Sequence, residues 1–196
     1  MSLPHFFLRE QVLAFESAPV FALHLDADDT KHAKVLRLAV GEHIAVVDAV
    51  SDYFECEVVS FEGDELSVSI AQKLSSYARP EVVLVQGLAK GEKMDTIVRH
   101  ATEVGIAEFV PMTTSRSVVK LDAKKSKARF ERWASIAKSA AMQSGRSSKP
   151  VVHAPCSVAG AVDITKDCDA VLICWEEAEL SNTLAEAVSC CIAATG

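Results

Sequence analysis

The stretch that decides the fold is Glu81–Met112, "EVVLVQGLAKGEKMDTIVRHATEVGIAEFVPM". It opens with "EVVLVQGL", an apolar run typical of a strand buried on both faces. Lys90–Gly105 then has helical spacing of its apolar residues, with Gly105 as a stop signal. "IAEFVPM" predicts the next strand, so the stretch indicates a parallel βαβ unit. The expected apolar stripe of its helix is Met94, Ile97, Val98, Ala101 and Val104.

The same alternation continues along the chain. "SKARFERWASIAKSAAMQ", residues 126–143, predicts a helix whose buried face holds Phe130, Trp133, Ala137 and Ala140. Lys125, Arg129 and Arg132 are expected on the opposite side. "AVLICWEE", residues 170–177, predicts a third buried strand. Residues 81–196 therefore predict a parallel α/β domain.

Residues 1–72 have a different pattern. Three short segments rich in Val, Ile, Phe and Tyr predict strands over residues 42–50, 53–63 and 65–73, with Gly63-Asp64 as a hairpin turn. One helix is expected near "DADDTKHAKVLRLAVG", capped by Asp28, Asp29 or Thr30 and followed by Gly41. Several strands with one helix suggest a small β-barrel, and residues 73–80 suggest a linker.

Charge is segregated along the chain, whose formal net charge is −7. Residues 1–72 carry 4 basic and 13 acidic side chains, whereas residues 73–150 carry 15 basic and 7 acidic ones. Between Arg116 and Lys149 there are 10 basic residues and only two acids. A local positive field of this kind can recruit a polyanion, although a solvated helix face explains a charge run equally well.

Several function classes lack their motifs. There is no Gly-x-Gly-x-x-Gly after the first α/β strand, no P-loop and no Gly-x-Ser-x-Gly elbow. The six histidines make no metal pattern, and each is expected at the surface or at a cap. The six cysteines form no Cys-x-x-Cys pair, which makes a zinc site improbable. Mostly buried, reduced thiols without an export signal predict a cytoplasmic protein.

Candidate site residues follow the predicted strands, because ligands of open α/β sheets bind outside the carboxyl ends of the strands. These positions are Gly87, Lys90, Gly91 and Lys93 after the first strand, Thr113–Arg116 after the second, and Glu176 and Glu177 after the third. A further polar cluster, Gln143–Arg146, follows a helix end instead, so it lies outside this rule. No residue stands out as a general base.

A family resemblance now emerges from motifs spread over nearly the whole chain. Lys-Gly-x-Lys-Met-Asp, Ala-Thr-Glu-x-Gly, Arg-Ser-Val-Val, Arg-Trp-x-x-Ile-Ala and Gln-Ser-Gly-Arg occur in this order between Lys90 and Arg146. "PHFF" and "HAKVLRLAVGEHIAVVD" precede them. Together they resemble the RsmE family, the 16S ribosomal RNA uridine N3-methyltransferases of the knotted SPOUT class.

The resemblance implies a fold, a reaction and partners. The family joins a PUA-like RNA-binding β-barrel to a SPOUT domain and acts as a homodimer. S-adenosylmethionine donates a methyl group to N3 of one uridine in 16S ribosomal RNA of the small ribosomal subunit. The expected fold is therefore α/β, with a PUA-like barrel over 1–72, a linker over 73–80 and a partial SPOUT domain over 81–196.

The resemblance also suggests roles for individual residues. The catalytic candidates are Arg116, Gln143 and Arg146, and the cofactor-binding candidates are Thr114 and Glu176. For Gln143 and Arg146, capping of a helix end is the alternative role. The RNA-binding candidates are Lys34, Arg37, Lys90, Lys93, Lys125, Arg129 and Arg132.

Two stretches of the family are not found among these residues. They are Gly-Pro-Glu-Gly-Gly and Leu-Gly-x-x-Ile/Val-Leu-Arg-x-Glu-Thr, which form the knot and most of the S-adenosylmethionine pocket. We therefore expect an incomplete knot and no proper cofactor binding by the 196 residues as they stand. A noncatalytic RNA-binding module and an unrelated α/β nucleotide-binding enzyme are the alternative functions.

Overall fold

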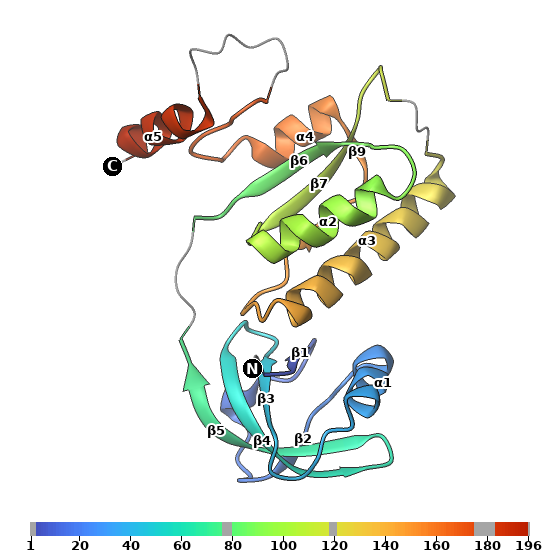
Figure 1. Ribbon diagram of the computed structural model, residues 1–196, viewed down its shortest axis with the longest axis vertical. Coiled ribbons are helices and arrows are strands. Elements are labelled where there is room, and N and C mark those ends of the chain that lie inside the picture. The colour runs from blue at the N-terminus through green and yellow to red at the C-terminus, as the bar shows by residue number, and fades with distance from the viewer. Residues whose placement is uncertain (1–2, 76–79, 118–120, 175–182, 196) are drawn as a thin grey trace.

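The protein is described here in a computed structural model, which places residues 3–75, 80–117, 121–174 and 183–195. The chain forms two units, one above the other in Figure 1. The N-terminal unit comprises residues 3–75, and the α/β unit comprises the described residues from 80 onward. Each unit has a sheet and a hydrophobic core of its own.

The N-terminal unit is a mixed sheet of five strands in the order β1-β3-β4-β5-β2. β1 pairs parallel with β3, and the remaining pairs are antiparallel. The strands are β1 (His5–Phe7), β2 (Phe21–Ala22), β3 (His43–Val47), β4 (Tyr53–Glu62) and β5 (Glu65–Leu74). Gly63, at φ 62°, turns β4 into β5, which confirms the predicted hairpin. β5 reaches Leu74, two residues beyond the predicted domain boundary at 72.

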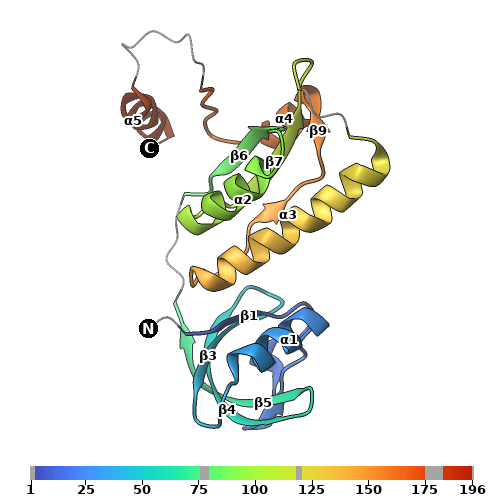
Figure 2. The ribbon, with the colours of Figure 1, turned by 45° about the vertical axis from the view of Figure 1, so that its right-hand side comes forward.

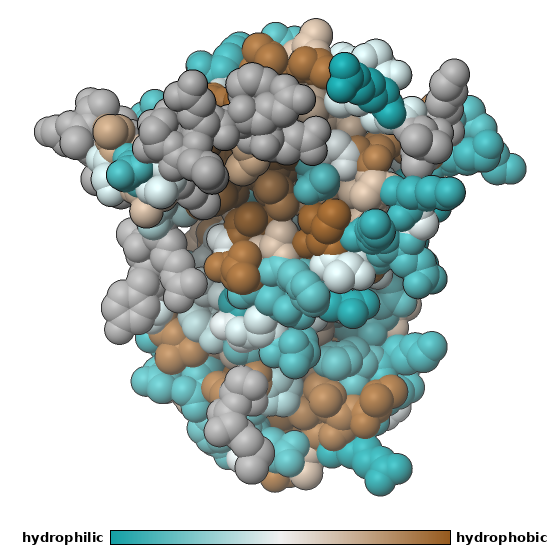
Figure 3. Space-filling model, turned by 45° about the horizontal axis from the view of Figure 1, so that its top comes forward, coloured by the Kyte–Doolittle hydropathy of each residue, from teal (hydrophilic) through white to brown (hydrophobic). Residues whose placement is uncertain are grey.

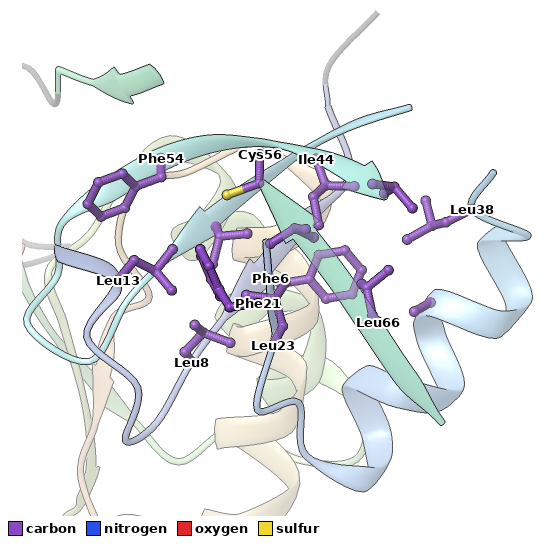
Figure 4. Packing of buried hydrophobic residues seen from close by; sticks show 14 residues of the cluster. Phe6, Leu8, Leu13, Phe21, Leu23, Leu38, Ile44, Phe54, Cys56 and Leu66 are labelled. Carbon is purple, nitrogen blue, oxygen red and sulfur yellow. The ribbon is translucent and has the colours of Figure 1, made fainter. Parts of the chain in front are cut away.

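The sheet of this unit curves around a core of aromatic and aliphatic side chains. Figure 4 shows Phe6, Phe21 and Leu23 turned toward one another beneath β4, with Leu13 of the 3-10 turn Leu13–Phe15 beside them. Phe6, Ile44 and Leu66 have no more than 1% of their surface exposed. Alternate residues of β4 face this core, as the pleat of a half-buried strand requires.

Helix α1 (Ala27–Leu36) is capped by Asp26, two residues before the first of the three predicted caps. The Asp26 side chain accepts a hydrogen bond from the Asp29 amide at 2.8 Å, so it satisfies a free donor of the first turn. Asp29 itself is buried and cannot cap from inside the helix. The helix ends at Arg37, which adopts the left-handed conformation (φ 56°), and Gly41 lies in the turn that follows.

The α/β unit contains the predicted strand–helix–strand order. Its strands β6 (Val83–Gly87), β7 (Glu108–Thr113), β8 (Val151–Val152) and β9 (Cys156–Ser157) are all parallel, with β8 and β9 pairing with successive parts of β7. Its helices are α2 (Lys93–Val104), α3 (Ala123–Gln143), α4 (Val158–Thr165) and α5 (Leu184–Thr195). α2 and α3 lie side by side in front of the sheet in Figure 1.

The core of the α/β unit lies between these two helices and the sheet. Met94, Val98, Phe109, Trp133 and Ala137 meet there, which confirms most of the predicted helix faces. Val104 is the last residue of α2 and is 79% exposed, so its predicted place in the apolar stripe of that helix is wrong. β6 is half-buried rather than buried on both faces, because it is an edge strand among the described ones.

The predicted third strand is absent from the described part of its segment. Residues 170–174 are exposed and pair with no strand, and residues 175–177 lie outside the described residues. An apolar run predicts burial only where a sheet edge accepts its backbone. Val171 and Ile173 are instead 62% and 85% exposed. Figure 3 shows such brown, hydrophobic surface among teal in the upper half of the molecule.

The C-terminal half of α3 joins the two units. Ala141 is completely buried against Phe7 of β1 and Val47 of β3, with Tyr53 and Met142 packed around them. Figure 2, like Figure 1, shows the lower end of α3 pointing into the N-terminal unit. No described helix is long and apolar enough to cross a membrane.

Candidate functional site

The carboxyl ends of β6, β7 and β9 form one edge of the α/β sheet, as the strand-end rule requires. This carboxyl edge holds Gly87 and Gly91, and no other atom lies within 4 Å of where a Cβ would stand on either glycine. The Thr114 amide donates a hydrogen bond to Ser117 Oγ at 2.9 Å, which folds the loop after β7 into a turn. The edge is thus open and rich in hydroxyl and amide groups.

Several predicted RNA-binding residues gather at this carboxyl edge. Lys90 and Lys93 stand at the start of α2, directly after β6. Lys125 and Arg129 stand in the first two turns of α3, which follows the loop that carries Arg116. Lys124 and Lys127 are also exposed there, although the sequence analysis did not select them. These cations thus stand on the elements that follow β6 and β7, and a common RNA-binding surface around Arg116 and Thr114 stays a prediction.

Arg132 is engaged within the fold. Its Nε and Nη2 donate to Asp95 Oδ2 at 2.9 and 2.7 Å, while the Trp133 indole donates to Asp95 Oδ1 at 3.1 Å. These hydrogen bonds, above all those from Arg132, hold the pKa of Asp95 below its usual value. The side chain of Arg132 is still 56% exposed. Asp95 thus fixes the start of α2 to the middle of α3.

The turn Gln143–Arg146 lies at the opposite edge of the sheet. Arg146 Nη1 donates to the carbonyl oxygens of Thr102 and Ile106 at 3.0 and 2.8 Å, where α2 ends and β7 is about to begin. Arg116 follows the far end of β7, roughly 20 Å away at ~3.3 Å per strand residue. One copy of the chain therefore does not bring Arg116 and Arg146 together. Gln143 is exposed at the end of α3.

His5 lies beside this turn and was wrongly expected at the surface or at a cap. It is 4% exposed, and its ring Cε1 is 3.6 Å from the point where a Cβ on Gly145 would stand. Its Nδ1 is 2.8 Å from the Leu3 carbonyl oxygen and its Nε2 is 2.7 Å from Tyr53 Oη. Burial lowers the pKa of His5 despite the Leu3 hydrogen bond. A neutral ring that donates from Nδ1 and accepts from Tyr53 satisfies both contacts.

The remaining basic candidates lie on the N-terminal unit. Lys34 pairs with Asp64 of the hairpin turn, and Arg37 is exposed at the end of α1. Two shallow surface hollows lie along this helix and the segment before it, and both are lined in part by Leu25. α1 is thus a second surface with exposed cations, apart from the carboxyl edge.

Lys138 and its partners were missed by the sequence analysis. Lys138 Nζ of α3 lies 3.0 Å from Asp26 Oδ2 and 2.8 Å from Asp29 Oδ2 of the N-terminal unit. Nothing in the sequence pairs residues more than 100 positions apart. From the sequence alone, a paired lysine in a basic helix cannot be distinguished from a lysine that is only solvated.

The prediction of mostly buried thiols is wrong. Cys56 is buried and Cys156 is partly so, but Cys168, Cys174 and Cys190 are exposed. The three exposed thiols stand after α4 and on α5, outside both cores. Within the described residues, no group of three His, Cys, Asp or Glu could hold a metal ion. Glu176, a predicted cofactor ligand, lies outside the described residues.

The sequence has curated relatives. It is 33% identical over 165 residues to ribosomal RNA small subunit methyltransferase E of Bacillus subtilis, covering 83% of this chain and 64% of the relative. It is 35% identical over 126 residues to the protein of the same name from Aquifex aeolicus, covering 63% of this chain and 54% of the relative. The chain thus spans between half and two thirds of the length of these relatives.

Solved structures share the fold. The crystal structure of ribosomal RNA small subunit methyltransferase E from Neisseria gonorrhoeae bound to S-adenosyl methionine matches with a TM-score of 0.70 at 25% identity, over 82% of this chain and 65% of that one. A Legionella pneumophila putative methyltransferase matches in fold with a TM-score of 0.74 at 22% identity, over 91% and 73%.

A family model covers the larger part of the chain. Residues 77–194 match the model described as an RNA methyltransferase domain. This range contains the carboxyl edge, the basic residues around it and the turn Gln143–Arg146. The match and the named relatives agree with the family resemblance carried by the sequence motifs. The chain therefore belongs to the RNA methyltransferase domain family.

Proposed function

We propose that this chain serves in the S-adenosylmethionine-dependent methylation of N3 of a uridine in 16S ribosomal RNA of the small subunit. The observation that carries the proposal is the carboxyl edge, where exposed cations follow the open strand ends of a methyltransferase fold along the chain. Family membership favours this function over a noncatalytic RNA-binding module. The N-terminal unit would act as the PUA-like RNA-binding module, and the protein would work as a homodimer.

The chemistry of the substrate explains which groups are needed. N3 of uridine is hidden in a base pair, so the target base has to be unpaired or extruded from its stack. Its N3–H proton has to leave as the ring nitrogen attacks, and the resulting imide anion is stabilised by nearby cations. Arg116 beside Thr114 is the proposed source of that charge at the carboxyl edge.

The carboxyl edge offers groups that suit S-adenosylmethionine. Gly87 and Gly91 leave open space, and Thr114 and Ser115 offer hydroxyl groups that suit the polar groups of S-adenosylmethionine. Bound S-adenosylmethionine would supply an electrophilic methyl group. Thr114 is the proposed cofactor ligand on this edge, with Glu176 as a further candidate outside the described residues. The described residues fit the cofactor without enclosing it.

Gln143 and Arg146 lie apart from the proposed site at the carboxyl edge. Because they lie at the other edge of the sheet, they could act on the same substrate only if a second copy brought them to the carboxyl edge of the first. The hydrogen bonds of Arg146 to the end of α2 favour the capping role for this residue within one chain.

The deciding experiment measures methyl transfer and cofactor binding with the same preparations. Small ribosomal subunits are incubated with the protein and S-adenosylmethionine, and N3-methyluridine is quantified by mass spectrometry of digested 16S RNA. Calorimetric titration with S-adenosylmethionine asks separately whether the 196 residues bind the cofactor. Stoichiometric binding would show that the expectation of no proper cofactor binding is wrong.

A charge variant tests the RNA surface. Replacing Lys124, Lys125 and Lys127 together by Gln should weaken RNA binding and lower the slope of log K against log salt by ~0.7 for each lost contact to single-stranded RNA. Lys166→Gln, an exposed position after α4, is the matched control and should leave the slope unchanged. An unaltered slope in the triple variant would refute binding at this edge.

A further inference from the structure

Lys138 bridges two carboxylates where the two units join. Lys138 Nζ of α3 lies 2.8 Å from Asp29 and 3.0 Å from Asp26, on either side of the start of α1. The side chain of Lys138 is 19% exposed, that of Asp26 20% and that of Asp29 only 3%. Exposed ion pairs contribute little, but a cation held by two carboxylates at a sheltered contact has a defined geometry.

The two carboxylates are themselves fixed in place. Asp26 caps α1 through the Asp29 amide and also pairs with Arg9 at 2.9 Å. Asp29 belongs to the first turn of the helix and is buried. Burial raises the pKa of Asp29 against the attraction of Lys138, so this carboxylate depends on its cation. Lys138 therefore binds to a rigid pair of oxygens rather than to mobile side chains.

Much of the remaining contact between the units is apolar. Phe7, Val47 and Ala141 form its buried centre. Apolar contacts are non-directional. The apolar patch of Phe7, Val47 and Ala141 therefore holds the two units together without setting the angle between them. The ion cluster of Asp26, Asp29 and Lys138 is directional, and it lies at the start of α1. It is suited to fix the orientation of that helix relative to α3.

Helices α1 and α3 each carry exposed cations at a distance from the contact between the two units. Lys31, Lys34 and Arg37 follow along α1, and Lys124, Lys125 and Lys127 mark the far end of α3. Fourteen helical residues separate Lys124 from Lys138, or roughly 21 Å at ~1.5 Å per residue. A change of angle at Lys138 is therefore amplified along α3 and displaces one basic surface relative to the other.

We propose that Lys138 is a positioning residue, which holds α1 and α3 at the angle at which their two basic surfaces bind one RNA together. This inference rests on the proposed function, since it takes RNA as the shared ligand. Lys138 itself need not touch the RNA. Lys138 holds the basic surfaces of α1 and α3 in one fixed arrangement. An RNA that binds the first surface then meets the second at a high effective concentration.

The test compares Lys138→Met with Lys138→Arg in the full chain. Methionine keeps the unbranched stem of the side chain and lacks only the terminal ammonium group, whereas arginine restores a cation that can bind both carboxylates. Small-angle X-ray scattering reports the distribution of distances between the units, and RNA affinity is measured over a range of salt. Lys166→Met is the control for loss of one surface cation.

The expected result has three parts. Lys138→Met broadens the distance distribution, weakens binding of 16S RNA by about tenfold or more and lowers the salt slope by more than the ~0.7 of one lost contact, because the surfaces no longer act together. Lys138→Arg recovers both properties. Circular dichroism of Lys138→Met stays that of the wild type, since neither core contains the cluster.

Two results would overturn the inference. One is an unchanged scattering profile in Lys138→Met. The other is a broadened profile with unchanged RNA affinity and salt slope. If the wild type itself binds no 16S RNA, the proposed function fails, and the scattering comparison alone decides whether Lys138 fixes the two units.

Discussion

Arg132 donates two hydrogen bonds to a single carboxylate oxygen of Asp95, at 2.9 and 2.7 Å. The other oxygen of Asp95 accepts from the buried indole of Trp133. A residue predicted to bind RNA therefore also links α3 to the first turn of α2. The side chain of Asp95 is 9% exposed, so its contacts are more sheltered than those of a surface pair.

Substitutions of Asp95 should separate its two contacts. Asp95→Asn keeps an acceptor for the Trp133 indole, whereas Asp95→Leu leaves that buried N–H without a partner. We expect Asp95→Leu to be less stable than Asp95→Asn by about 1–3 kcal/mol, the usual cost of an unsatisfied buried donor. Denaturant unfolding measures the difference. Equal stabilities would contradict the structural role of the indole contact.

Asp95 should also make stability depend on acid pH. Its pKa is lowered in the fold, first by the Arg132 hydrogen bonds. The resulting stability is present above the ordinary Asp pKa of about 4 and is lost as the pH falls through the lower folded value. The unfolding free energy of the wild type should therefore approach that of Asp95→Asn as the pH drops from 5 toward 2. A difference that stays constant over this range would exclude the linkage.

Arg146 should stabilise the end of α2. Arg146→Met removes the two hydrogen bonds to the Thr102 and Ile106 carbonyls and is expected to cost about 1–3 kcal/mol, as for other bonds from charged donors. Amide hydrogen exchange should accelerate in the last turn of α2. RNA affinity should change less than in the triple lysine variant. Gln143→Ala, which alters an exposed side chain in the same turn, serves as the control.

Gly145 and Gly91 form a matched pair for backbone strain. Both have φ of 68°, but a Cβ on Gly145 would stand 3.6 Å from His5, whereas one on Gly91 would meet nothing within 4 Å. A distance of 3.6 Å is ordinary contact, so Gly145→Ala and Gly91→Ala should each cost about 1–2 kcal/mol from the left-handed conformation alone. A much larger loss of unfolding free energy in Gly145→Ala would mean that the contact between Gly145 and His5 has no room for an added atom. Thermal unfolding of both variants decides this.

The thiols should react in two classes. Burial raises the pKa of Cys56 to about 12, so its thiol is neutral and shielded at pH 8. Cys168, Cys174 and Cys190 are exposed and should be alkylated in the native protein. Peptide mapping by mass spectrometry after a short iodoacetamide pulse distinguishes the sites. Native alkylation of Cys56 as fast as that of Cys168 would contradict the burial.

Local patterns predicted the elements whose partners are near in sequence. The hairpin at Gly63, the helix before Gly105 and the buried face of Trp133 all follow from periodicity and turn residues. β1 and β2 were not predicted. They contain three and two residues, and their formation depends on pairing with strands about 40 positions away. An apolar run without such a partner, as at residues 170–174, did not become a strand.

The candidate site was predictable to a smaller extent. The strand-end rule correctly brought Thr114, Arg116 and Lys90 to one edge, since it depends only on the order of parallel strands. The sequence could not show that Arg132 faces Asp95 or that Lys138 faces Asp29, because charge patterns specify the sign of a side chain and not its partner. Arg146 was selected from its motif alone, and its place at the opposite edge depends on how α3 crosses the sheet.

The pairing of β1 has a consequence for synthesis of the protein on the ribosome. Phe7 of β1 needs β3, some 40 residues later, to complete its sheet, and Ala141 of α3 to cover its side chain. At ~5–20 residues per second, translation from Phe7 to Ala141 takes roughly 7–27 s. During that interval the hairpin of β4 and β5 can already close. The earliest strand in the chain is thus among the last to acquire its complete set of neighbours.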